Sequence, residues 1–172
     1  MDFDALRRNF YANSSCGICG KATIDNVLAV APALDDDSRF APAFLYALPS
    51  RLLGAQAVFE RTGGLHAAGL FDASGTLLIA REDVGRHNAV DKVIGWALLE
   101  DRLPLRSCAL LVSGRVSYEI VQKALAARIP VVAGLSAPTS LAVELAVRAQ
   151  LTLVGFLRGR AFSVYAAPER LS

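Results

Sequence analysis

The 172-residue sequence has little of what marks several large classes of protein. It holds three cysteines, two histidines and one tryptophan, and its formal net charge is only +2. The cysteines are too few for a disulfide-stabilised secreted scaffold, and so small a charge does not indicate a nucleic-acid-binding protein. No apolar run approaches the roughly 20 residues of a membrane-spanning helix. We therefore expect neither a nucleic acid nor a membrane as a partner.

No signal peptide follows Met1, and an odd number of cysteines without one indicates a reducing compartment. We therefore expect a cytoplasmic protein. Hydrophobic residues make up 53% of the chain and charged residues 20%, which is typical of a folded domain. A chain of this length can form one domain with a sizeable core.

Two of the cysteines stand close together, in Cys16-Gly-Ile-Cys19. Two serines precede the pair, and Gly20 and Lys21 follow it, so the segment predicts an exposed and flexible site rather than core. A neighbouring lysine favours the nucleophilic thiolate. We expect residues 1–22 to form a mobile arm that carries this motif, and residues 23–172 to form a single domain.

Four roles are open to Cys16 and Cys19. A structural zinc site needs about four ligands, and the usual donors elsewhere are only Cys108, His66 and His87. A thioredoxin-like dithiol lies between a strand and a helix, whereas this pair precedes the predicted sheet. The pair could also be purely structural. The fourth role is that of a sulfur carrier, in which an exposed thiolate accepts sulfane sulfur and passes it on. Exposure and reach favour the carrier, with no bound metal.

Apolar periodicity along the chain predicts alternating helices and strands. A helical pattern over Leu48–Arg61 ends at Gly63-Gly64, and a hairpin follows around Asp72-Ala-Ser-Gly75. His66 is expected to enter the first hairpin strand and pack in the core, and Cys108 to be an inert core residue. Helices and short apolar strands then alternate, which is typical of an α/β domain with a mixed, mostly parallel sheet. Helices are predicted over 88–99, 117–127 and 139–149, and strands over 65–71, 76–80, 108–112, 129–133, 151–156 and 161–165.

Three predicted strand-to-helix junctions are unusually polar: Arg81–Asn88, Ser113–Ser117 and Gly134–Ser140. Ligands of α/β sheets bind at the carboxyl ends of strands, and free N–H groups at helix starts bind anions. We expect a phosphate-bearing ligand here, held by Arg86, His87, Ser113 and Arg115. The alternative is that Ser117, Thr139 or Ser140 are simply helix N-caps, and that His87 braces its loop. Neither the dinucleotide fingerprint nor the P-loop motif occurs.

Five motifs together resemble the FdhD family, the formate dehydrogenase accessory sulfurtransferases. They occur in family order: Ser15–Lys21, Gly63–Ala67, Arg81–Lys92, Ser113–Ser117 and Ser136–Ser140. The resemblance implies a cytidine-deaminase-like three-layer α/β/α domain and a homodimer. It also implies a sulfur carrier, rather than a multiple-turnover enzyme, that is needed for formate dehydrogenase activity. The sulfur would come from a cysteine desulfurase and go to the molybdenum bis(molybdopterin guanine dinucleotide) cofactor, in whose place a guanine nucleotide could bind.

The resemblance also assigns residues. Cys16 matches the persulfide-forming cysteine and Cys19 its partner, and the segment that contacts the cofactor matches Phe156, Leu157, Arg158, Gly159, Arg160 and Ala161. Two departures stand out: roughly a hundred residues that usually precede the cysteine pair are absent, and Ser163 replaces a common asparagine. A cofactor-binding chaperone without sulfur transfer and a thiol–disulfide oxidoreductase are the alternative functions. Nucleobase deamination is excluded, because the H-x-E and downstream PCxxC motifs of zinc deaminases are missing.

Overall fold

The computed structural model describes the backbone of residues 21–172 and the side chains of residues 24–172. Cys16 and Cys19, and nearly all of the predicted arm, lie outside the described residues. Among the helices that the structure describes, none has the length and apolar character needed to cross a membrane. The elements are α1 (Lys21–Val30), α2 (Pro42–Leu53), α3 (Ala57–Thr62), β1 (His66–Phe71), β2 (Leu77–Asp83), α4 (Arg86–Leu99), β3 (Ala109–Val112), α5 (Tyr118–Ala126), β4 (Val131–Gly134), α6 (Ser140–Arg148), β5 (Thr152–Arg158), β6 (Ala161–Ala166) and a 3-10 turn at Pro168–Arg170.

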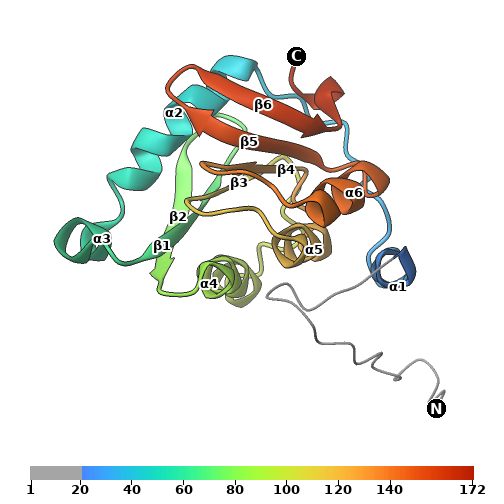
Figure 1. The fold of residues 1–172 in the computed structure, drawn as a ribbon, viewed down its shortest axis with the longest axis horizontal. Coiled ribbons are helices and arrows are strands. Elements are labelled where there is room, and N and C mark those ends of the chain that lie inside the picture. Colours follow the sequence, from blue (N-terminus) through green and yellow to red (C-terminus); the bar gives the residue numbers. More distant parts are fainter. Residues whose placement is uncertain (1–20) are drawn as a thin grey trace, which may run out of the picture.

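The strands form one mixed sheet in the order β2-β1-β3-β4-β5-β6 (Figure 1). The pairs β3–β4 and β4–β5 are parallel, whereas β1–β2, β1–β3 and β5–β6 are antiparallel. The expected mixed α/β sheet is confirmed, and its parallel part is the centre. Both outer pairs are antiparallel because short turns join their strands, at Asp72–Gly75 and Gly159–Arg160.

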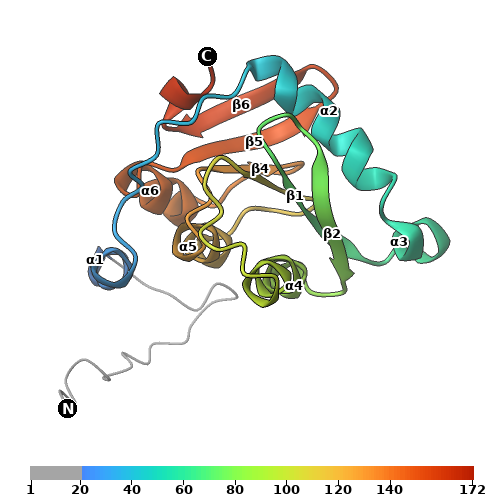
Figure 2. The ribbon, with the colours of Figure 1, turned by 180° about the vertical axis from the view of Figure 1, so that it is seen from behind.

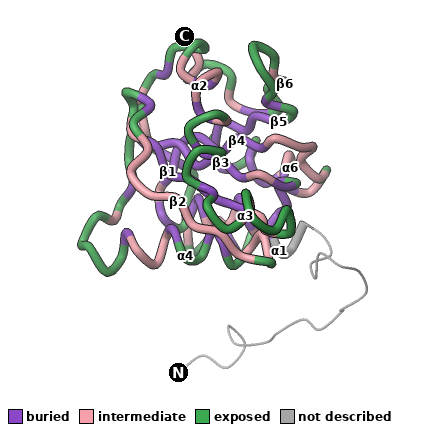
Figure 3. The backbone as a smooth tube through the Cα atoms, turned by 90° about the vertical axis from the view of Figure 1, so that its left-hand side faces the viewer, coloured by how far each residue is buried: buried purple, intermediate pink, exposed green. Residues whose placement is uncertain are grey.

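Helices cover both faces of this sheet, which makes three layers. Figures 1 and 2 show α4, α5 and α6 along one face and α2 on the other. Successive strand residues serve the two faces alternately, as the pleat requires: Leu110 and Val112 pack in the core beneath α4–α6, and Leu111 packs in the core beneath α2. In Figure 3 the tube is buried through β1, β3, β4 and most of β5, whereas the edge strands β2 and β6 are intermediate or exposed.

Strand direction decides where a site can form. Strand β2 runs antiparallel to β1, and β1 antiparallel to β3, so β2 shares the direction of β3, β4 and β5. These strands therefore end at one edge of the sheet, where β1 begins with His66. All three polar junctions predicted from the sequence lie at this carboxyl edge.

One predicted element differs in the structure. The helical pattern over Leu48–Arg61 corresponds to two helices, because the chain turns at Gly54–Gln56 between α2 and α3. Helix α2 also begins earlier, at Pro42, where the fixed φ of proline suits the first turn. The predicted end at Gly63 is confirmed: this glycine ends α3 with φ +64°, a left-handed conformation that favours glycine.

Candidate functional site

The loop that precedes α4 is held by the Asp83 carboxylate. It accepts hydrogen bonds from Gly85 N at 2.9 Å and from Asn88 Nδ2 at 3.0 Å, and it pairs with Lys92 Nζ at 2.6 Å. The hydrogen bond from Lys92, followed by those from Gly85 and Asn88, lowers the pKa of Asp83 to about 2. This network sets the position at which Arg86 and His87 enter α4.

The side chains of Arg86 and His66 both lie close to Gly114. A Cβ atom added to Gly114 would lie 3.2 Å from His66 Nδ1, so the His66 ring would have to shift slightly, and 3.5 Å from Arg86 Cδ, which is an ordinary contact. The Nε atom of Arg86 is buried without a hydrogen-bond partner among the described residues. His66 is half-buried at this edge, and the prediction that it packs in the core is wrong, because it is the first residue of β1 rather than a central one.

His87 joins two helices. Its Nε2 atom lies 2.7 Å from the Ser117 hydroxyl and 3.6 Å from Glu119 Oε2, so it connects the starts of α4 and α5. Burial, followed by the charge of Arg86, lowers the pKa of His87. The hydroxyl of Ser117 makes no helix-capping bond. The bracing role considered for His87 therefore describes its contacts in this structure.

The second and third junctions pack directly on each other. Val116 N donates to Ala137 O at 3.2 Å, and Thr139 N donates to Val116 O at 2.9 Å. Thr139 is also the N-cap of α6, because its hydroxyl accepts from Ala142 N at 3.2 Å. The junctions predicted to converge therefore do so.

Ser113 and Arg115 differ in their surroundings. The Ser113 hydroxyl accepts from Ala67 N at 2.9 Å, which leaves its proton available to a ligand. Arg115 is exposed and forms no ion pair or hydrogen bond with any described residue. A free guanidinium at the carboxyl edge of the sheet can bind an anion.

The β5–β6 connection reaches the same edge, and it carries the Phe156–Ala161 segment. Phe156 N donates to Ser136 O at 3.2 Å, and Arg158 Nε approaches Leu135 O at 3.4 Å. Phe156 has φ +53° and a 43% exposed side chain, while Leu157 is buried in the core beneath α2. Gly159, Arg160 and Ala161 are exposed at the turn.

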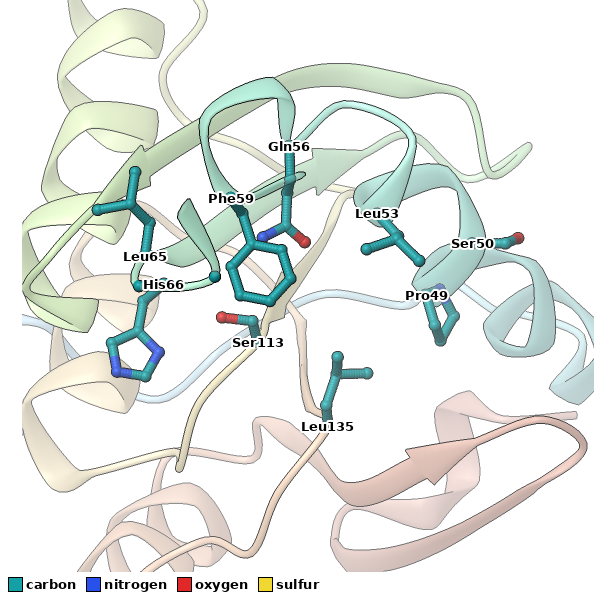
Figure 4. A pocket seen from close by; sticks show the side chains of 11 residues that line it. Pro49, Ser50, Leu53, Gln56, Phe59, Leu65, His66, Ser113 and Leu135 are labelled. Atoms are coloured by element: carbon teal, nitrogen blue, oxygen red, sulfur yellow. The ribbon is translucent and has the colours of Figure 1, made fainter. Parts of the chain in front are cut away.

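A cleft of about 530 Å³ opens beside this edge, between α2–α3 and the sheet (Figure 4). Most of its lining is apolar, and its polar side chains include Gln56, His66 and Ser113. Helix α3 forms one wall of the cleft. The Glu82 carboxylate fixes the start of this helix, because it accepts hydrogen bonds from Val58 N at 3.0 Å and from Phe59 N at 2.7 Å. Sequence reasoning missed Gln56, and the only signal was a polar residue at the break between two helical segments.

The third cysteine lies outside this region. Cys108 is buried, and burial raises the pKa of its thiol to about 11. Its prediction as a buried core residue is confirmed. Among the side chains that the structure describes, no three His, Cys, Asp or Glu residues are grouped to hold a metal ion.

These observations define a three-layer α/β protein whose sheet has helix N-termini along its carboxyl edge, together with arginines that form no ion pair with any described residue. The sequence model of the FdhD/NarQ family matches residues 2–172, and the chain belongs to this family.

Proteins named sulfur carrier protein FdhD are close relatives. That of Mycolicibacterium paratuberculosis is 57% identical over 169 residues, which are 96% of this chain and 62% of the relative. That of Streptomyces avermitilis is 56% identical over 170 residues, 97% of this chain and 60% of the relative. That of Sulfolobus acidocaldarius is 51% identical over 164 residues, 95% and 63% of the two chains. The chain thus spans about three fifths of the length of these relatives.

A solved structure shares the fold. A candidate formate dehydrogenase accessory protein from Desulfotalea psychrophila superposes with a TM-score of 0.75 at 32% identity, covering 84% of this chain and 62% of that one.

Proposed function

We propose that this chain acts as a sulfur carrier for formate dehydrogenase. Cys16 takes sulfur from a cysteine desulfurase, Cys19 assists its release, and the carboxyl edge of the sheet binds the molybdenum bis(molybdopterin guanine dinucleotide) cofactor that receives it. The protein would work as a homodimer in the cytoplasm, where reducing conditions keep both thiols free. Membership of a family whose relatives are named sulfur carrier proteins supports the first half of this proposal.

The observation that carries the second half is the set of cations at the carboxyl edge without carboxylate partners among the described residues. Arg115 and Arg160 make no polar contact there, Arg158 has only a carbonyl oxygen, and Arg86 Nε is buried and unpaired. A buried charged group needs a partner, and an exposed guanidinium without a partner is free to bind an anion. Phosphate groups are such anions, and the N-termini of α4, α5 and α6 would add N–H donors.

Sulfur transfer balances with the donor persulfide, the two cysteines and an external dithiol. The Cys16 thiolate attacks the terminal sulfur of the donor persulfide; a new S–S bond forms on Cys16, and the donor cysteine leaves as its thiolate. The Cys19 thiolate then attacks the Cys16 sulfur, which releases hydrosulfide and forms a Cys16–Cys19 disulfide. The two cysteines supply both electrons, and a cellular dithiol must reduce the disulfide before the next cycle.

Intact mass spectrometry after incubation with a cysteine desulfurase and cysteine tests the carrier role. We expect a gain of about one sulfur atom that dithiothreitol removes. Cys16→Ala should abolish the gain, and Cys108→Ala, the matched control at a buried thiol, should leave it unchanged. A Cys16→Ala protein that still supports formate dehydrogenase activation would indicate a cofactor-binding chaperone instead. Turnover of a generic disulfide would indicate an oxidoreductase.

A further inference from the structure

A groove runs between α1 and α5, on the face of the sheet opposite to α2. Figures 1 and 2 both show α1 beside α5 and far from α2 and α3. The hollow between the two helices has a volume of about 300 Å³. Its lining comes from the end of α1 and the exposed side of α5: Asn26, Val27, Val30, Ala31, Gln122 and Ala126.

The walls of this groove are held in place from two sides. Arg128, which follows α5, donates to Pro32 O at 2.5 Å and to Ala33 O at 3.1 Å just beyond α1. Asp25 of α1 forms an ion pair with Arg148 of α6. Helix α1 is therefore fixed against both neighbouring helices, and a partner that binds the groove has little chain to order.

Val30 makes the groove an apolar surface rather than a polar one. It is the last residue of α1, and its 88% exposure is the highest among the large hydrophobic side chains that the structure describes. A single exposed valine is ordinary on a protein surface, but this one stands beside Val27, Ala31 and Ala126 in one hollow. The amide of Gln122 adds a group that can donate and accept hydrogen bonds. Apolar contacts with a few polar groups around them are typical of the centre of a protein interface.

The position of α1 in the chain indicates which protein covers the groove. Lys21 begins α1, five residues after Cys16 in the sequence, and five residues span at most about 18 Å. The 10-residue helix α1 is itself only about 15 Å long. A stable interface covers about 800 Å² on each protein, a patch roughly 30 Å across. A donor whose persulfide is attacked by Cys16 must contact that residue, so its contact surface also reaches α1.

We propose that the groove between α1 and α5 is the docking surface of the protein that delivers sulfur to Cys16, and that this donor buries Val30 with an apolar side chain of its own. The inference rests on the proposed function, since it concerns the donor of the sulfur that the chain carries. The groove and the cleft beside α2 lie on opposite faces of the sheet, so the donor surface is separate from the proposed cofactor site.

Binding of a purified cysteine desulfurase to the full chain tests the proposal. The Kd is measured by biolayer interferometry without added cysteine, so that no sulfur is transferred. Val30→Asp places a charge at the centre of the proposed contact and should raise the Kd by about tenfold to a hundredfold. Leu99→Asp is the matched control, because Leu99 is the last residue of α4 and is 84% exposed. It should leave the Kd unchanged.

A second variant keeps the test decisive if Val30→Asp fails to fold, which thermal unfolding checks. Ala126→Glu fills the groove from α5 at an exposed position and should also weaken binding severalfold. The inference would be overturned if the wild-type chain did not bind the desulfurase, or if every folded groove variant bound it as tightly as the wild type. It would also be overturned if Val30→Asp converted a dimer to monomers in gel filtration, because the groove would then be a contact between two copies.

Sulfur loading of Cys16, measured by mass spectrometry on the same preparations, separates this inference from the carrier proposal. Binding that depends on the groove without any loading of Cys16 would contradict the carrier proposal alone. Loading of Cys16 with an unchanged Kd in the groove variants would contradict only the docking surface.

Discussion

Replacing Gly134 with alanine should force apart the loops that form the site. Gly134 ends β4, and an added Cβ atom would lie 2.7 Å from Val116 Cγ2, 3.3 Å from Ser136 O and 3.5 Å from Gly114 O. The nearest of these atoms belongs to a fully buried side chain, and the other two belong to backbone. The buried Val116 side chain has little room to rotate and Ser136 O belongs to backbone, so we expect the loops themselves to move.

The expected cost follows from this overpacking. Extra methyl groups in a close-packed site cost about 1–3 kcal/mol, and each kcal/mol moves the Tm of a domain of this size by about 2–4 °C. Gly134→Ala should therefore lower the Tm by about 2–12 °C. Gly95 on α4 provides the matched control, because an added Cβ there meets nothing within 4 Å. In a helix interior the same change should stabilise the fold by about 0.5–1 kcal/mol.

Urea and thermal unfolding followed by the fluorescence of the single tryptophan, Trp96, measure both variants. The indole lies 5.0 Å from the Arg102 guanidinium and is half-buried, so unfolding changes its surroundings. The two substitutions should shift the midpoint in opposite directions. A Gly134→Ala protein as stable as the wild type would refute the close contact between the second and third loops.

The remaining predictions concern single side chains. Arg115→Ala should leave the Tm unchanged and weaken GDP binding by about 1–3 kcal/mol, the scale of a charged hydrogen bond. An unchanged Kd in calorimetry would show that Arg115 does not contact the ligand. Burial and Arg86 lower the pKa of His87 from 6.5, so its neutral form contributes stability above that pH, and the contribution is lost as the pH falls through the lowered value. His87→Gln should therefore reduce the loss of Tm on acidification, which is measured by recording the Tm of both proteins over a range of pH. If the Tm of the variant and that of the wild type fell by the same amount, this role of His87 would be contradicted. Because the pKa of Cys108 is raised to about 11, iodoacetamide at about pH 8 should modify it in urea but not in the folded protein.

The order of elements could be predicted because apolar periodicity reports which face of each element is buried. The helix expected over 88–99 is α4, and the strand expected over 108–112 is β3, each shifted by at most two residues at its ends. The break between α2 and α3 could not be predicted, because apolar residues on both sides of Gly54 keep a helical spacing. The turn becomes evident only in the structure, where the Glu82 carboxylate of β2 accepts hydrogen bonds from Val58 N and Phe59 N at the start of α3.

The site could be predicted in part, for a similar reason. Convergence of the polar loops follows from strand direction, which the alternation of helices and strands implies. The partners of individual side chains do not follow from it. Nothing in the sequence connects His87 to Ser117, 30 residues away, or places the Gln56 amide in a cleft. Such contacts depend on how the helices sit on the sheet.

The loop Gly134–Ser140 contacts the cleft, the second junction and strand β5, so displacing it should affect more of the proposed ligand site than removing Arg115 does. In the loop Gly134–Ser140, Leu135 lines the cleft, its carbonyl oxygen contacts Arg158, and Ser136 O holds the β5–β6 turn. Displacing this loop with Gly134→Ala should weaken the binding of free pterin and of GDP alike, because the proposed cofactor carries a pterin and a guanine nucleotide. Arg115→Ala should weaken GDP alone, because pterin carries no phosphate for the guanidinium to bind. If both variants weakened both ligands equally, the ring and the phosphates would not occupy separate parts of this edge.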